Sequence, residues 1–241
     1  MTYQQLVCLG LGGIFEGYGP HAFLLCQTGV LPVDVIRLVD GKKFRAENRG
    51  RQHFHEVREK AVERTKLWRR MYPDLPLRSR AAFVDASNVA DIVTDGSIVL
   101  LSPDNHATRR LVSEHACTLD NILLITGTND AINQEEGLDG TEGQAIAHWR
   151  IEGQNRTAPI TRYHEEIQTA TAGLPTQLSC EELARSHPQL LATNLLVGQA
   201  MVLLLQRYLL QPPEEAVKIV EYGVNSREGT LVPYGIDSRK P

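Results

Sequence analysis

The feature that most constrains the fold is a regular alternation of apolar, strand-like runs with helical stretches over the first half of the chain. The spacing predicts helices from the first glycine turn to Leu25, from Val57 to Tyr72, and from Asn105 to Leu119. The apolar runs predicted as strands are QLVCLG from Gln5, VIRLV from Val35, RAAFV from Arg80, SIVLLS from Ser97 and NILLITG from Asn121. This order predicts an α/β, Rossmann-like fold with a mainly parallel sheet flanked by helices.

The second half has a different pattern. Residues 130–143 are acidic and glycine-rich, which predicts a loop, and QAIAHWRIEG after them predicts a strand. Ser179 is a predicted helix N-cap with Glu182 at the capping-box distance, and Pro188 breaks or restarts that helix. The tail predicts two antiparallel strands around a turn at residues 227–229. We therefore expect a single domain over 1–241, with a core at 1–129 and a C-terminal part of helices and strands at 144–241.

Composition and charge exclude several classes. A net charge of -4 with interspersed acids and bases argues against a nucleic-acid-binding protein. The four cysteines form no C-x-x-C pair, so neither a zinc site nor a disulfide scaffold is indicated, and no targeting signal is visible. A cytoplasmic protein is the expectation. The apolar segment Leu190–Leu210 is interrupted by polar residues, which favours a core or subunit-interface helix over a membrane span.

A glycine-rich turn follows the first predicted strand. In GLGGIFEG, Gly10, Gly12 and Gly13 could let backbone N–H groups approach a phosphate at a helix N-terminus. Phe15 stands at the third position of the G-x-G-x-x-G pattern, so the alternative is a merely tight strand-to-helix turn. Asp40 ends the second predicted strand, where an acid can bind ribose hydroxyls, and this favours a nucleotide.

Polar side chains that suit phosphate and metal follow two of the strands. Asn48, Arg51 and Gln52 come after the second strand, and an arginine fork suits phosphate oxygens. Asp104, after the fourth strand, could supply a carboxylate to Mg²⁺, or it could simply cap the next helix. The nearby histidines, at positions 53 and 55, are interpreted as solvated.

These motifs, GLGGIFEG, VDGKKFRAENRGRQ, a Lys-Ala and SPDNHATRR, occur in an order that resembles the ThiF/MoeB family, the bacterial relatives of ubiquitin-activating enzymes. The resemblance covers about Leu6 to Gly127. Beyond it, SCEELARSHPQLLATNLLVGQA is most similar to the stand-alone ThiF-related proteins of PRTRC plasmid cassettes. The resemblance implies ATP-dependent adenylation of a carboxylate, usually the C-terminal glycine of a small ubiquitin-like or sulfur-carrier-like protein. It also implies a homodimer.

The resemblance further implies roles for individual residues, with the turn glycines at the nucleotide and Asn105 in the same site. Asp40 would hold the ribose of ATP, and Asp104 would hold Mg²⁺. Lys60 would support the phosphates, with Lys66 as a second candidate. The residues that would meet the phosphates are Asn48, Arg51 and Gln52. Lys42 departs from the family pattern, because a second acid often stands at its position.

Cys180 follows the predicted N-cap at Ser179, where the helix dipole would lower the pKa of a thiol. It is the candidate to accept an adenylated substrate as a thioester, although a small residue without chemistry would also fit there. Two other functions stay open: an NAD-dependent oxidoreductase that uses the same glycine turn, and a non-catalytic family member that only binds a protein partner. Phe15 and Lys42 favour the second.

Overall fold

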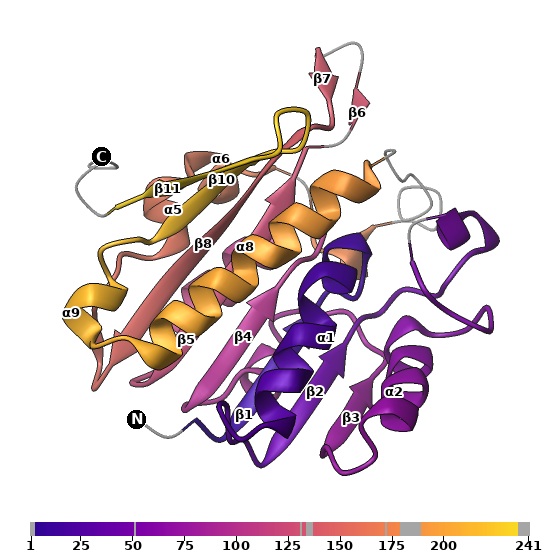
Figure 1. Ribbon diagram of the computed structural model, residues 1–241, viewed down its shortest axis with the longest axis horizontal. Coiled ribbons are helices and arrows are strands. Elements are labelled where there is room, and N and C mark those ends of the chain that lie inside the picture. Colours follow the sequence, from indigo (N-terminus) through magenta and orange to yellow (C-terminus); the bar gives the residue numbers. More distant parts are fainter. Residues whose placement is uncertain are drawn as a thin grey trace.

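The computed structural model describes residues 3–50, 52–130, 132–133, 137–171, 173–178 and 189–235. Within these ranges one mixed sheet has the strand order β11-β10-β8-β5-β4-β1-β2-β3 (Figure 1), with the short β9 (Gln154–Asn155) paired to β8. The main strands are β1 Gln5–Leu9, β2 Val35–Val39, β3 Leu77–Arg80, β4 Ser97–Leu101, β5 Ile122–Asn129, β8 Glu142–Ile151, β10 Glu221–Asn225 and β11 Thr230–Tyr234. Strands β1 to β5 are parallel, and β8, β10 and β11 are antiparallel. The predicted fold class is therefore confirmed.

Helices cover both faces of the sheet. The longer ones, α1 (Gly13–Gln27), α2 (Lys60–Met71) and α8 (Leu191–Leu210), lie together on the face turned toward the viewer in Figure 1. The opposite face is covered by α3 (Val89–Ile92), α4 (His106–Ala116), α5 (Ile160–Tyr163) and α6 (Glu165–Gln168). Strand residues alternate between the two layers, as in β1, where Leu6 and Cys8 pack with α1 and α8 while Val7 and Leu9 pack with α4. Burial on both faces explains why these strands are almost continuously apolar.

Helices α1 and α8 touch through their backbones at a pair of glycines. A Cβ on Gly198 would lie 2.6 Å from Gly17 Cα, and one on Gly17 would lie 2.7 Å from Leu195 O. Gln199 Nε2 donates to Gly17 O at 2.8 Å across the same contact. The segment expected as a core or interface helix thus packs against α1. No helix within the described ranges has the length and apolarity needed to cross a bilayer.

The third strand was predicted in the wrong place. RAAFV was expected to be a strand, but β3 occupies Leu77–Arg80 and only Arg80 is shared. The reason is its partner: β3 pairs with β2 in parallel, and β2 ends at Val39, opposite Arg80. Beyond that point Phe83 packs closely against Gly41, where an added Cβ would lie 2.5 Å from the ring. Phe83 therefore packs beside a loop, and Val84 is buried in the hydrophobic core although it belongs to no strand.

Smaller differences occur at element ends. Helix α2 begins at Lys60 rather than Val57, and α4 ends at Ala116 rather than Leu119. The predicted loop at 130–143 contains the two-residue strands β6 (Ile132–Asn133) and β7 (Leu138–Asp139), and β8 already starts inside it. The other short elements are η1 Ala46–Gly50, η2 Pro175–Gln177 and α9 Pro213–Ala216. The tail hairpin is confirmed by β10 and β11, whereas the capping box at Ser179 and the break at Pro188 lie outside the described residues.

The two edges of the described sheet carry unusual strand residues. At one edge β3 has the sequence LRSR, with Arg78 exposed and Arg80 half-buried. At the other edge β11 contains Pro233, which lies opposite Tyr222 of β10. Proline has no backbone N–H and is tolerated in sheets mainly at edges.

Candidate functional site

The candidate residues gather at the carboxyl ends of the parallel strands. The chain runs from β1 outward to β2 and β3, and then returns to β4 on the other side of β1. The loops after β1 and β4 lead to helices on opposite faces of the sheet, and α/β sheets commonly bind ligands at such a point. The glycine turn follows β1, Asp40 follows β2, and Asp104 follows β4, so three predicted site segments meet here.

Packing explains two of the three turn glycines. Gly10 has φ +86°, and its Cβ would lie 2.6 Å from the backbone of Ser102 and Pro103. A Cβ on Gly13 would lie 2.2 Å from the side chain of Asn194. A Cβ on Gly12, the residue at the N-cap of α1, would meet nothing within 4 Å. Among the described residues no protein contact accounts for Gly12, and the space beside this glycine is open to a ligand.

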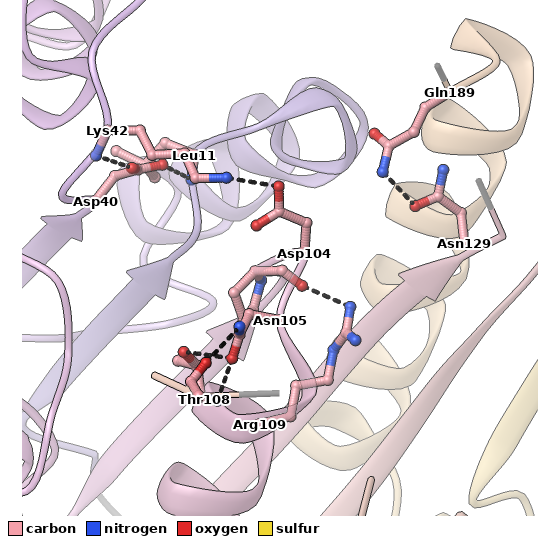
Figure 2. Close-up of polar contacts among 11 residues, drawn as sticks. Leu11, Asp40, Lys42, Asp104, Asn105, Thr108, Arg109, Asn129 and Gln189 are labelled. Carbon is pink, nitrogen blue, oxygen red and sulfur yellow. Dashed lines mark hydrogen bonds and ion pairs between the residues drawn. The ribbon is translucent and has the colours of Figure 1, made fainter. Parts of the chain in front are cut away.

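Asp40 connects the loop after β2 to the glycine turn. Its Oδ2 accepts a hydrogen bond from Leu11 N at 2.8 Å, and its Oδ1 accepts one from Lys42 N at 2.7 Å (Figure 2). Each carboxylate oxygen can accept a second hydrogen bond. Asp40 is therefore fixed by the backbone and retains the capacity to bind hydroxyl groups.

Asn105, and not Asp104, caps helix α4. Asn105 Oδ1 accepts from Thr108 N at 2.9 Å, and its Nδ2 donates to Gly173 O at 3.1 Å. The alternative that Asp104 is the helix cap is therefore wrong. The Asp104 side chain is 53% exposed, and its Oδ2 lies 2.7 Å from Lys42 Nζ, as Figure 2 shows.

Electrostatic coupling connects the charged groups of the site. Partial burial raises the pKa of Asp104, but the charges of Lys42, Lys60 and Arg109 outweigh this and keep the pKa below its ordinary value. Burial lowers the pKa of Lys60, and the positive charge of Lys42 lowers it further. The negative charges of Asp40 and Asp104 act in the opposite direction but do not cancel the effect. The structure thus places four charged groups close enough to affect one another electrostatically: Asp40, Lys42, Lys60 and Asp104.

Lys60 and Lys66 have different surroundings, although both lie on α2. Lys60 opens the helix, is 7% exposed, and has its Nζ 5.5 Å from the centre of the Phe44 ring. Lys66 Nζ instead donates to Glu56 Oε1 at 3.0 Å, and its side chain is 43% exposed. Of the two candidates, Lys60 is the one placed with the site carboxylates.

An aromatic stack supports the loop between β2 and α2. The rings of Phe44 and Phe54 are parallel with centres 4.3 Å apart, and the Arg49 guanidinium lies 4.9 Å from the Phe54 ring. Asn48 is buried, and its Oδ1 accepts a hydrogen bond from the backbone nitrogen of Arg45 at 3.0 Å.

Gln52 follows in the same loop and is buried beside Asn48. Its Oε1 has no hydrogen-bond partner among the described residues. A buried oxygen without a partner is costly unless a ligand or water satisfies it. Arg51, between these two residues, lies outside the described part of the chain.

Two buried arginines were not predicted as site residues. Arg64 pairs with Glu16 of α1, and its guanidinium lies 5.0 Å from the Phe44 ring. Its spacing from Lys60 on one helix face was the available signal. Arg109 Nη2 donates to Pro103 O at 2.5 Å, which fixes the residue before Asp104. Burial lowers the pKa of Arg109 to about 10.

Neither a thiol site nor a metal cluster is found in the described ranges. Burial raises the pKa of Cys8, of Cys26 to about 12, and of Cys117. Cys117 is the C-cap residue of α4 and is half-buried. Cys180 lies outside the described residues. No group of three or more His, Cys, Asp or Glu side chains gathers there to hold a metal.

A family model described as the ThiF family matches residues 2–231. The chain belongs to the ThiF family. Solved structures with the same fold include Escherichia coli MccB with ATP, at 14% identity and a TM-score of 0.66 over 97% of this chain and 64% of that chain. The microcin C7 biosynthetic enzyme MccB in complex with N-formylated MccA matches at 14% identity and 0.66, over 99% and 66%. Selenomethionine PaaA matches at 12% identity and a TM-score of 0.60, over 97% of this chain and 64% of that chain.

This ThiF-family chain spans slightly under two thirds of the length of each of those three proteins. No curated protein matches its sequence. At these identities the structures establish a shared fold, and ATP and N-formylated MccA are the ligands of MccB in those structures.

Proposed function

We propose that this ThiF-family protein uses ATP to adenylate a carboxylate. The observation that carries the proposal is the convergence of Asp40, Lys60 and Asp104 beside the glycine turn. In this reaction a carboxylate oxygen forms a bond to the α-phosphorus. The α–β phosphoanhydride bond breaks, and pyrophosphate leaves with the electron pair. Negative charge accumulates on the phosphate oxygens, and preorganised cations stabilise it.

Each part of the site has a role in this proposal. Asp40 accepts the ribose hydroxyls with its remaining lone pairs, and the phosphates lie in the open space at Gly12. Lys60 contributes a partly desolvated ammonium, whose attraction to phosphate is stronger than it would be in water. Asn48, Gln52 and Arg51 line the phosphate path, Arg51 as the resemblance to the family implies.

Asp104 fits the role of a Mg²⁺ ligand. Its carboxylate is exposed, and Mg²⁺ commonly takes one or two carboxylates together with phosphate oxygens and water. Because no protein cluster could hold the ion alone in the described ranges, ATP and water would complete its coordination. Bound Mg²⁺ would neutralise charge on the phosphates.

The acyl substrate is proposed to be the C-terminal carboxylate of a small protein or peptide. The family resemblance supports a ubiquitin-like or sulfur-carrier-like protein. The complex of MccB with N-formylated MccA supports the wider class of small protein or peptide. Similarity to the PRTRC subgroup stays a prediction, since its segment lies partly outside the described residues.

Calorimetric titration with Mg-ATP and with NAD tests the proposal first. We expect Mg-ATP to bind in preference to NAD, because a dinucleotide oxidoreductase has no need of Arg51 and Asp104 together. ATP–pyrophosphate exchange with an acyl partner is the second test. Asp104→Ala and Arg51→Ala should abolish exchange without unfolding the protein, whereas Lys66→Ala, at the exposed pair with Glu56, should retain it. Tighter binding of NAD, or full exchange in both site variants, would contradict the proposal.

The second candidate is a non-catalytic family member. The ion pair of Lys42 with Asp104 favours it, because the lysine ammonium binds the carboxylate that is proposed to bind the metal. Such a protein would bind its partner protein and show no pyrophosphate exchange with it. The exchange assay therefore separates the two candidates.

Cys180 is proposed as the thiol that receives the adenylated substrate, if a thioester forms. The raised pKa values of Cys8, Cys26 and Cys117 support this choice, because those thiols are protonated at neutral pH. Incubation with ATP and the partner protein, followed by a non-reducing gel, should give a thiol-sensitive adduct that Cys180→Ala lacks. An adduct that persists in Cys180→Ala would refute the assignment.

A further inference from the structure

The ion pair between Lys42 and Asp104 joins the loops after β2 and β4 across the end of β1. Lys42 lies on the loop after β2 and Asp104 on the loop after β4, and β1 lies between these strands. Their charged atoms are 2.7 Å apart, and the side chains are 31% and 53% exposed. In Figure 2 the lysine extends beside Leu11, the residue in the glycine turn, to reach the carboxylate. The contact therefore spans the place where the nucleotide is proposed to bind.

The backbone of Lys42 is held by two other residues of the proposed site. Lys42 N donates to Asp40 Oδ1 at 2.7 Å, and Lys42 O accepts from Lys60 N at 2.9 Å. Both backbone polar groups are thus engaged, so the starting point of the side chain is fixed. From this point the ammonium reaches Asp104, and the flexible lysine stem allows it to leave without a change in the backbone.

Positive side chains already outnumber the negative charge of the Asp104 carboxylate when no metal is bound. Lys42, Lys60 and Arg109 all act on the Asp104 carboxylate. A divalent ion on the same carboxylate would meet the Lys42 ammonium at contact distance, and like charges at that separation repel strongly. A polyphosphate would supply the negative charge that lets both cations stay.

We propose that Lys42 is the resident cation of the Asp104 carboxylate in the free protein. A divalent metal binds Asp104 only when Lys42 is displaced, and the polyphosphate of the nucleotide draws the ammonium away. This inference rests on the proposed ATP site and deepens it. It makes metal and nucleotide binding cooperative through one side chain of the protein, because each favours the state without the Lys42–Asp104 pair.

The direct test is Mn²⁺ binding to the nucleotide-free protein, measured by electron paramagnetic resonance. Lys42→Met keeps the length of the side chain and removes its charge, so it should tighten Mn²⁺ binding at least about fivefold. Lys42→Arg should bind Mn²⁺ as weakly as the wild type. Lys43→Met is the matched control: Lys43 is the next residue, 70% exposed, and faces Glu59 at 3.6 Å, so its dissociation constant should not change.

Asp104→Asn locates the effect. We expect the gain from Lys42→Met to disappear when Asp104→Asn is added. An unchanged Mn²⁺ dissociation constant in Lys42→Met would overturn the proposal, as would a gain that persists in the double variant. Melting temperatures of all variants establish that each protein is folded.

A second measurement separates this inference from the proposed function. ATP binding is titrated in EDTA, where no metal can help. Lys42→Met should weaken metal-free ATP binding at least about fivefold relative to Lys43→Met, because the displaced ammonium pairs with phosphate in the wild type. Equal affinities of the two variants would refute that transfer. If the wild type binds no ATP even with Mg²⁺, the proposed function fails, while the Mn²⁺ titrations still decide whether Lys42 guards Asp104.

Discussion

Gly10 and Gly12 stand one residue apart and meet different constraints. Gly10→Ala would place a methyl group 2.6 Å from the backbone after β4, at φ +86°, and should destabilise the protein by about 2 kcal/mol or more. The methyl group of Gly12→Ala meets no atom of the described residues within 4 Å, so its free energy of unfolding should stay within about 0.5 kcal/mol of the wild type. Its ATP affinity should nevertheless fall, because the methyl group enters the proposed phosphate space.

Urea denaturation and calorimetric ATP titration of both variants check this expectation. The prediction holds only if Gly10→Ala loses stability while Gly12→Ala keeps its stability and loses ATP affinity. Equal loss of stability in Gly12→Ala, or unchanged ATP affinity in a folded Gly12→Ala, would show that the space has another role.

The sequence revealed some site residues and concealed others for identifiable reasons. Asp40 and Asp104 follow apolar strands, and position after a strand can be predicted. The contact of Lys42 with Asp104 could not be predicted, because it joins residues 62 apart through one side-chain conformation. Asp104 and Asn105 are both good capping residues, and only backbone geometry decides that Asn105 accepts the bond from Thr108.

Helices α5 and α6 meet the antiparallel strands through His164. Its Nε2 lies 3.2 Å from Glu221 Oε2 of β10, and its Nδ1 lies 2.9 Å from Glu166 Oε1 and 3.1 Å from Gln144 Nε2 of β8. Burial lowers the pKa of His164, but the hydrogen bond and charge of Glu221, with those of Glu166, outweigh this and raise the pKa above its ordinary value of 6.5. The His164 ring therefore connects the short helices to the sheet, and its protonated form strengthens this connection.

A raised folded-state pKa stabilises the protein below the unfolded pKa, and this stabilisation is lost as the pH rises through the folded value. The difference in unfolding free energy between wild type and His164→Gln should be largest at pH 6 and should shrink toward pH 9. Urea denaturation of both proteins at intervals of one pH unit measures this difference in unfolding free energy. A difference that is constant or grows with pH would show that folding does not raise the pKa of His164.

Strands and helices were predictable to different degrees at the level of elements. The apolar runs at β1, β2, β4 and β5 were predicted within one or two residues, because burial on both faces leaves an unambiguous pattern. β3 is an edge strand with only one apolar residue that is buried, Leu77, so its sequence carries almost no signal. The apolar run after it was mistaken for the strand.

Self-association is the main prediction for the whole molecule. Helix α8 keeps large side chains exposed along its length: Leu191 44%, Leu195 37%, Leu203 41% and Leu210 64%, and Leu24 of the neighbouring α1 is 49% exposed. An apolar surface of this kind commonly marks an interface. We expect a homodimer, and Leu203→Glu should give a monomer because a carboxylate would be buried between the copies.

Light scattering at micromolar concentration measures the mass. Met71→Glu is the control, since Met71 is 62% exposed at the end of α2 and its replacement should leave the dimer intact. A monomeric wild type would contradict the expectation.

The residues at the two edges of the sheet also have a consequence for solubility. Pro233 removes one of the N–H groups with which another chain could pair to β11, and the arginines of β3 would repel the same strand of a second molecule. Both outer strands of the described sheet therefore discourage edge-to-edge stacking, the step that begins fibril growth. When this protein is concentrated or partly unfolded, we expect amorphous aggregates through its apolar helix surfaces rather than ordered β-fibrils.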